Sequence, residues 1–473
     1  MDVDLAPAAA PPAARPPLPR RPLSPSVALL AEWCLAGLVL AIAFFRGLER
    51  VPLHMDESLW IAHSLYLEAA LDDGFVPPDW LREEASRTAP TDPAGAADGW
   101  SRRRTFAPHY STLDQPMLAR FLIGAGRRLQ GFGPDALNRP WQLRLSREEN
   151  DRAGNVPSPG LLLAARRTSA LLGVAGGLLL FGLVRQGAGR AAGLLFVLLF
   201  AASPYLQTHL RRAMGDPALF FFCCLSLWAG ARALRSGAGA GETPGRAGSP
   251  RALAWLAAAG AAAGLAGASK LNGLGVAGAA VLLGAALAFH PRRPGSLRRR
   301  LGFAAAAGLV VLSTCAATFV AVNPSLHRRP AAHLSAMLEL RTRELAGHRA
   351  DPRWGLADPA RRVRVVLGRT LQHYAVVRVA PLNAFLGAAG LLALARAARR
   401  WTVDGAGPPA APALLAGALF LAGPALLTPV DWDRYYLFPV VFLTVLLAAG
   451  AAALPGEARR LRGAGPARHE GAA

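Results

Sequence analysis

Long apolar runs recur along the whole chain, and most of them approach 20 residues. A helix needs about 20 apolar residues to cross a hydrocarbon core of roughly 30 Å. The pattern therefore predicts an all-α polytopic membrane protein with about ten transmembrane helices. The predicted spans cover residues 26–45, 166–184, 191–206, 216–232, 252–268, 271–289, 301–322, 381–396, 410–427 and 435–454.

Arginines cluster in the short loops after every second span and in both terminal segments. By the positive-inside rule, these loops and both termini are expected in the cytoplasm, and the two long connections on the outer side. The predicted division is a disordered cytoplasmic tail (1–25), a first transmembrane helix (26–46), an outer loop (47–165), transmembrane helices 2–7 (166–322), a second outer loop (323–380), transmembrane helices 8–10 (381–454) and a cytoplasmic tail (455–473).

The first outer loop has its own hydrophobic pattern. Residues 57–71 are apolar and aromatic with a sparse polar face, which predicts an amphipathic helix in the membrane interface, with Trp60 and Tyr66 at head-group depth. Residues 114–124 predict a second apolar helix, too short to span. The segments Pro77 to Pro108 and Gly131 to Gly160 are predicted to be polar insertions.

Composition agrees with a membrane protein, since 53% of residues are hydrophobic and the mean hydropathy is +0.28. The net charge of +22 would suggest nucleic acid in a soluble protein. Here the arginines fall between apolar runs, so orientation and anionic lipid head groups account for them, and nucleic acid is excluded as a partner. Lys270 is the only lysine, and its survival in an arginine-biased chain indicates a function.

An acidic pair, Asp56 and Glu57, follows the first predicted span. Adjacent helix positions point about 100° apart, so one carboxylate is expected to face a cavity and the other to support it or face water. A carboxylate at a membrane surface can act as a general base toward a hydroxyl or amine. The alternative is a helix start, in which Asp56 caps the helix and both acids favour its dipole.

Three further outer turns supply polar groups. Arginine suits bidentate contact with phosphate oxygens and lysine supplies a point charge, so these turns predict contacts with a phosphate or sugar. The alternatives are an Arg212–Asp216 pair, a snorkelling Lys270 and an Asp433–Arg434 pair within an aromatic belt. The candidates for binding a donor's phosphate and sugar are His209, Arg211, Arg212, Asp216, Lys270, Asn272, Arg434 and Tyr435.

In their order along the chain, these segments resemble the glycosyltransferase C superfamily, and within it the protein O-mannosyltransferase and lipid A aminoarabinose transferase branch. The acidic pair Asp56-Glu57 matches the position of that family's catalytic acid. Residues 114–120 (DQPMLAR) resemble the mannosyltransferase Asp-x-His-Pro-Pro-Leu-x-Lys region, which makes Asp114 and Gln115 candidates for acceptor binding. Residues 167–171, 211–216, 269–273 and 434–439 also resemble family segments.

The resemblance implies transfer of a sugar, mannose or a similar one, from a polyprenyl-phosphate donor to an extracytoplasmic acceptor, with inversion. Asp56 would deprotonate or orient the acceptor, and the cations would stabilise the phosphate leaving group. The resemblance suggests a bacterial plasma membrane. Gln115 and Met117 depart from the family's His and Pro, which leaves the acceptor open. A divalent metal at Asp56 also stays open, since the spacing shows no ligand cluster.

One rival interpretation is a non-catalytic membrane scaffold, which would not need an acid and phosphate-binding cations facing the same side. The other is a transporter or flippase of a lipid-linked substrate. Such a protein places polar groups along a path through the midplane, often on broken helices. In this chain the charged clusters fall at one side of the predicted bundle, and Glu32 is the main charge within a span. The pattern therefore favours the glycosyltransferase over the transporter.

Overall fold

The computed structural model describes residues 25–71, 110–237 and 250–463, apart from residues 294 and 328. The predicted tail before Pro25, the insertion at 77–108 and the last ten residues lie outside the described residues. The described chain folds into helices, with one isolated β-bridge between Gly355 and Val430. The predicted all-α polytopic fold class is confirmed.

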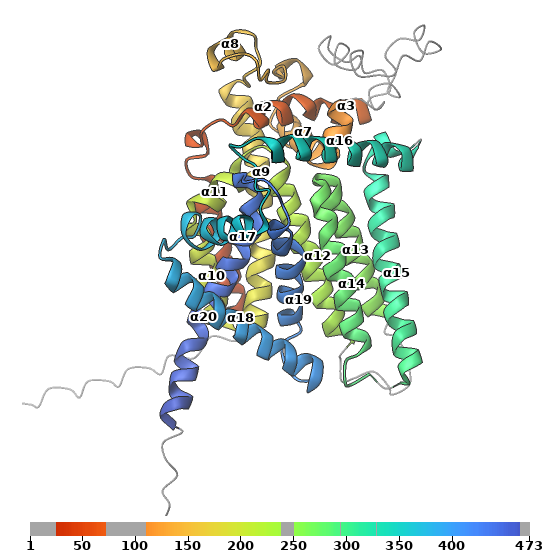
Figure 1. Cartoon of the computed structure of the whole chain (residues 1–473), viewed down its shortest axis with the longest axis vertical. Coiled ribbons are helices and arrows are strands. Elements are labelled where there is room, and N and C mark those ends of the chain that lie inside the picture. The colour runs from red at the N-terminus through yellow and green to blue at the C-terminus, as the bar shows by residue number, and fades with distance from the viewer. Residues whose placement is uncertain (1–24, 72–109, 238–249, 294, 328, 464–473) are drawn as a thin grey trace, which may run out of the picture.

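Eight helical segments in the described part of the chain are long and apolar enough to cross a membrane. They are Ser26–Arg50, Pro159–Ala188, Gly215–Gly237, Pro250–Ser269, Leu271–Ala288, Leu297–Ala321, Ala380–Val403 and Asp433–Pro455. They correspond to the helices α1 (Pro25–Phe45), α9 (Pro159–Ala188), α12 (Gly215–Gly237), α13 (Pro250–Ser269), α14 (Gly275–Ala288), α15 (Leu297–Ala321), α18 (Ala380–Val403) and α20 (Leu437–Gly463), and Figure 1 labels all of these but α1.

Two of the ten predicted spans differ in the structure. Residues 191–206 do not form one straight helix, because α10 (Arg190–Ala202) is followed by α11 (Pro204–Arg211) at an angle of 71°. Ser203 ends the first helix in extended backbone and caps the second by accepting from the amide of Leu206. Residues 410–427 form a shorter apolar segment, α19 (Ala410–Gly417) with the short turns that continue it to Leu426.

Glycine residues allow the backbones of α18 and α20 to approach each other closely. At Gly390 of α18, an added Cβ would lie 1.9 Å from the carbonyl oxygen of Leu446 in α20. At Gly450 of α20, it would lie 2.1 Å from the carbonyl oxygen of Leu386. Helices in lipid pack through such small residues, which let backbones approach. The two glycines therefore fix the contact between α18 and α20.

Short helices lie across one end of the upright bundle (Figure 1). They include α2 (Met55–Ala62), α3 (Tyr66–Leu71), α6 (Tyr110–Asp114), α7 (Leu118–Leu129), α8 (Arg147–Arg152), and α16 (Pro330–Ala350). We call this the outer end, after the predicted orientation.

The prediction for residues 57–71 was wrong in its placement of the aromatic side chains. Trp60 and Tyr66 are 6% and 1% exposed, because α7 packs over them. The guanidinium of Arg120 lies 5.4 Å from the Trp60 ring centre and 5.7 Å from that of Tyr66. These rings therefore belong to the protein core beneath α7.

The opposite end of the bundle contains the buried carboxylate of Glu32. It pairs with Arg185 at 2.6 Å and with Arg190 at 2.7 Å. Since α9 ends three residues after Arg185, this charge lies at a helix terminus and not along a path through the middle of the bundle.

Candidate active site

A small polar pocket, here the central pocket, lies at the outer end where five segments meet. Its cavity has a volume of about 140 Å³. The segments are α2, the turn after α6, the start of α12 with Lys270 beside it, α16, and the loop before α20. The lining side chains are Asp56, Leu59, Trp60, Asp114, Gln115, Met214, Asp216, Lys270, Arg341, Glu344, His348, Trp432 and Arg434.

Local sequence fixes the direction of Asp56. His54, and not Asp56, caps α2, because its ring nitrogen Nδ1 accepts from the amide of Asp56 at 3.1 Å. Burial lowers the pKa of His54 against the opposing effect of Asp56, and Arg212 and Arg434 lower it further. A neutral ring keeps the acceptor lone pair that the cap needs. The Asp56 carboxylate is left to face the pocket, where it meets Arg434 Nη1 at 2.5 Å.

Glu57 points the other way and does not line the pocket. Its carboxylate is fully buried and accepts from Arg166 through both oxygens, at 2.8 and 2.7 Å. It also accepts from the amides of His54 and Ala213. The structure thus separates the acidic pair as expected, with Asp56 facing the cavity and Glu57 supporting it.

Asp216 and Lys270 form the second charged contact of the pocket. Lys270 Nζ donates to Asp216 Oδ1 at 2.7 Å, and the two side chains are 12% and 5% exposed. Asp216 thus pairs with Lys270 and not with Arg212. Burial lowers the pKa of Lys270; Asp216 opposes this, and Arg434 adds to it. The lysine is therefore a poorly hydrated cation at the pocket wall and not a snorkelling side chain.

The third charged contact involves Arg341 and Glu344 of α16, which the sequence interpretation missed. Arg341 of α16 pairs with Asp114 and with Glu344, the latter at 2.8 Å. Its guanidinium also donates to the backbone carbonyl of Asp114. Because Asp114 and Gln115 line the pocket as well, the proposed acceptor residues and α16 meet there.

Aromatic rings form one wall of the central pocket. Trp432 stacks with Tyr435 at 5.5 Å between ring centres, and His348 meets the Trp432 ring edge-on at 4.3 Å. The guanidinium of Arg434 lies 4.9 Å from the Trp432 ring centre. Tyr435 therefore supports Trp432 and does not itself line the cavity. No motif in the sequence had singled out Trp432 or His348.

The remaining predicted donor-binding residues lie outside the pocket lining. Arg211 donates to the backbone carbonyls of Ala43 and Arg46, so it satisfies the end of α1. His209 is buried beside Asp433, with 3.6 Å between their side-chain atoms. Asn272 is exposed in the turn after Lys270, and Arg212 lies near His54 and His209.

The described residues contain no group of three or more His, Cys, Asp or Glu side chains placed to hold a metal ion. In the central pocket, Asp56 and Asp216 each face a cation instead.

Part of the chain matches the model of a known protein family. Residues 110–325 match the family model of the dolichyl-phosphate-mannose-protein mannosyltransferases. This match confirms the predicted resemblance over these residues. The matched part contains Asp114, Asp216 and Lys270, whereas Asp56 and Arg434 lie outside it. No functionally curated protein matches the chain significantly.

Several solved structures are similar to the chain at low identity. The Pmt1–Pmt2 protein O-mannosyltransferase complex of S. cerevisiae bound to the sugar donor is 18% identical, with a TM-score of 0.43 over 67% of this chain. AglB, the oligosaccharyltransferase of Archaeoglobus fulgidus, is 15% identical, with a TM-score of 0.49 over 94% of this chain. ArnT from Cupriavidus metallidurans bound to undecaprenyl phosphate is 18% identical, with a TM-score of 0.45 over 93% of this chain. The chain covers 35%, 53% and 63% of these structures.

Proposed function

We propose that the chain is a multi-pass membrane glycosyltransferase that moves a sugar, mannose or a similar one, from a polyprenyl-phosphate donor to an extracytoplasmic acceptor. The acceptor is a protein hydroxyl, a glycan or a lipid. The observation that carries the proposal is the central pocket, where Asp56 faces Lys270, Arg341 and Arg434 at the outer end of the bundle. A base and several cations in one pocket are what transfer from a phosphate ester requires.

Lys270 and Arg434 are the proposed contacts of the donor phosphate. Each is held by a carboxylate, Lys270 by Asp216 and Arg434 by Asp56, so both cations are positioned before a donor arrives. When the bond from the sugar to the phosphate breaks, its electron pair stays on the phosphate. Fixed cations stabilise this developing charge more in the transition state than in the bound donor.

Asp56 is the proposed general base. A phosphate that binds Arg434 competes with Asp56 for the guanidinium, and a carboxylate with less cationic contact is the stronger base. Asp56 then takes the proton of the acceptor hydroxyl while the hydroxyl oxygen forms a bond to the anomeric carbon. Attack opposite the departing phosphate inverts the configuration of that carbon. Glu57 positions this base, since Arg166 fixes the first turn of α2.

The sugar and the acceptor are assigned to the remaining walls. A sugar ring packs on aromatic faces, and Trp432 presents such a surface to the pocket. Asp114 and Gln115 line the same pocket and supply hydrogen-bonding groups for the acceptor, with Arg341 holding Asp114 in place.

The proposed location is the plasma membrane, with both termini cytoplasmic and the central pocket facing outward, as the arginine pattern predicts. The placement of charge supports an enzyme over a transporter or flippase. Within the described residues, the pocket's ion pairs gather at the outer end, and Glu32 lies at the opposite helix termini. A transport path would need polar groups between these two ends.

The test is consumption of labelled polyprenyl-phosphate sugars by the purified protein in lipid nanodiscs, with membrane extract as acceptor. We expect one donor of the panel to be consumed by the wild type and not by Asp56→Asn. Asp135→Asn, which removes an exposed carboxylate outside the pocket, is the matched control. Consumption of no donor by the wild type would contradict the proposed function.

A further inference from the structure

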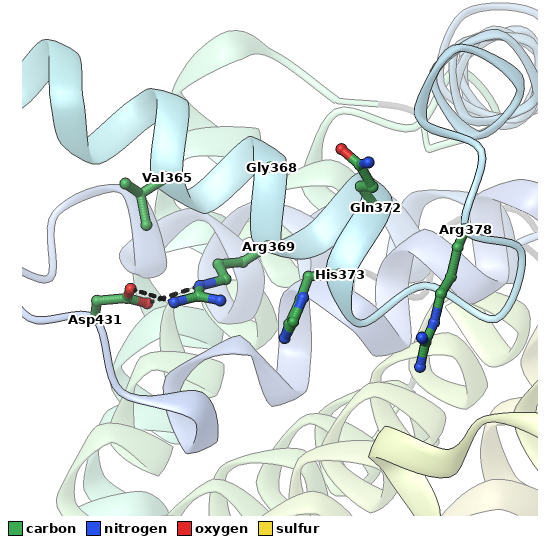
Figure 2. A pocket seen from close by; sticks show the side chains of 7 residues that line it. All are labelled: Val365, Gly368, Arg369, Gln372, His373, Arg378 and Asp431. Carbon is green, nitrogen blue, oxygen red and sulfur yellow. Dashed lines mark hydrogen bonds and ion pairs between the residues drawn. The ribbon is translucent and has the colours of Figure 1, made fainter.

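A second pocket, here the lateral pocket, lies beside the loop before α20. Its cavity measures about 440 Å³, within the range of roughly 300–1,000 Å³ of small-ligand sites. It is lined chiefly by Arg369, Gln372, His373, Arg378 and Asp431 (Figure 2). None of these residues lines the central pocket, so the proposed reaction does not use them.

The charges of the lateral pocket do not cancel. Arg369 pairs with Asp431 at 2.8 Å, and Tyr436 donates to the same carboxylate at 2.7 Å. Figure 2 shows this pair at one side of the cavity and Arg378 at the other. Among the described residues, the exposed guanidinium of Arg378 has no hydrogen-bond or ion-pair partner. Two arginines and one aspartate leave about one positive charge beside His373.

The lateral pocket opens at the end of a membrane span. Arg378 lies two residues before α18 (Ala380–Val403), which is long and apolar enough to cross a membrane. Large apolar side chains continue from the pocket along this helix: Val379 is 51% exposed, Leu382 42% and Phe385 59%. A cation at the end of an apolar, exposed helix face suits a lipid whose head group is charged and whose chains lie along that face.

We propose that the lateral pocket binds the phosphodiester head group of an anionic glycerophospholipid, with Arg378 as its main cation and the acyl chains along α18. The charge separates phosphodiester lipids from phosphate monoesters. A phosphodiester carries one negative charge, which the pocket's excess balances, whereas a phosphate monoester approaches two at neutral pH. Arginine also matches the geometry of phosphate oxygens through paired N–H groups. This site is distinct from the proposed donor site and does not depend on catalysis.

The test measures the affinity of the purified full chain for phosphatidylglycerol by native mass spectrometry in a neutral detergent. We expect Arg378→Gln to weaken the tightest phosphatidylglycerol binding about fivefold, the effect of one cation near an anionic head group. Arg399→Gln removes an exposed arginine near the opposite end of α18 and is the matched control, with unchanged affinity. Equal binding by wild type and Arg378→Gln would overturn the proposal.

Two further arms distinguish the ligand and the position. Undecaprenyl phosphate and phosphatidylcholine should each displace bound phosphatidylglycerol less effectively than added phosphatidylglycerol does. More effective displacement by either lipid would overturn the assignment to an anionic phosphodiester. Phosphatidylglycerol with a photoactivatable acyl chain should label residues 377–392, and labelling elsewhere alone would refute the site. Asp56→Asn should bind phosphatidylglycerol normally, so failure of the proposed transferase leaves this result interpretable.

Discussion

The carboxylate of Asp56 and the guanidinium of Arg434 lie 2.5 Å apart, although 378 positions separate them in the sequence. Both side chains are 26% exposed, so water and a ligand reach the pair from the pocket. The contact joins the first outer helix to the loop before the last span. In the proposed reaction it keeps the base and the phosphate-binding cation adjacent, and donor binding exchanges one anion for another on Arg434.

The first prediction concerns the base. Asp56→Asn keeps the size of the side chain and an oxygen for Arg434 but removes the proton acceptor, so we expect turnover to fall by about 10²–10⁴. Donor affinity should change little, because Lys270 and Arg434 remain. Single-turnover kinetics with the consumed donor, together with a binding isotherm, measure the two effects separately. Turnover near that of wild type would exclude Asp56 as the base.

A second prediction concerns Lys270. Because its ammonium is nearly buried and already oriented by Asp216, we expect Lys270→Ala to weaken donor binding by about tenfold or more, the effect of one lost charged hydrogen bond. An isotherm with a non-reacting donor analogue measures this loss. An unchanged isotherm would place the donor phosphate elsewhere.

The same residue predicts a pH dependence. Burial lowers the pKa of Lys270 below the ordinary value of 10.5, with Asp216 opposing this and Arg434 adding to it. The lysine is charged below its pKa, so a lowered pKa means that the charge is lost at a lower pH than in a solvated lysine. Donor affinity should therefore fall on the alkaline side before pH 10.5. In Lys270→Arg this fall should disappear, because arginine stays charged. If donor affinity of this variant showed the same pH dependence as the wild type, Lys270 would not be the group that titrates.

The third prediction concerns the buried pair of Glu57 and Arg166. Arg166→Met leaves a carboxylate without its bidentate partner in a site that is 0% exposed, so the free energy of unfolding should fall by about 3–5 kcal/mol. Arg167→Met is the matched control, since the adjacent arginine is exposed and donates a hydrogen bond to Gln130 instead of to a buried carboxylate. Denaturant unfolding in detergent measures both variants. Adding Glu57→Gln to Arg166→Met should restore part of the loss.

The fourth prediction concerns the contact between α18 and α20. Gly390→Ala places a Cβ 1.9 Å from the Leu446 carbonyl oxygen, so the helices must separate, at a cost of about 1–3 kcal/mol. Gly302→Ala in α15 meets no atom within 4 Å and should be neutral or slightly stabilising. Thermal unfolding of the two variants side by side checks this. Equal midpoints would mean that the helices are not in close contact.

The bundle was predictable because every helix that crosses the bilayer needs a minimum length of apolar sequence. The split roles of Asp56 and Glu57 also followed from the sequence, since adjacent helix positions diverge whatever the tertiary structure. The bend after Ala202 had a signal, Ser203 followed by Pro204, which favours a new helix start. Mean hydropathy does not register such a bend, so one straight span was predicted there.

The contribution of α16 was not predictable in the same way. Arg341 reaches Asp114 across 227 positions, and residues 323–380 contain many arginines with no local pattern that separates this one from the others. Arg211 illustrates the opposite error. Its position near the outer turn suggested a contact with the donor's phosphate. In the structure, the carbonyl groups at the end of α1 need hydrogen-bond donors, and the Arg211 guanidinium supplies them.

Lys270 has one more consequence, for chemical labelling. It is the only lysine in the chain, and its ammonium lines the central pocket. An amine-directed reagent that leaves arginine untouched therefore has a single side chain to modify, and that side chain is inside the pocket. Protection of this amine by a bound molecule reports occupancy directly, whatever the sugar or the acceptor turns out to be.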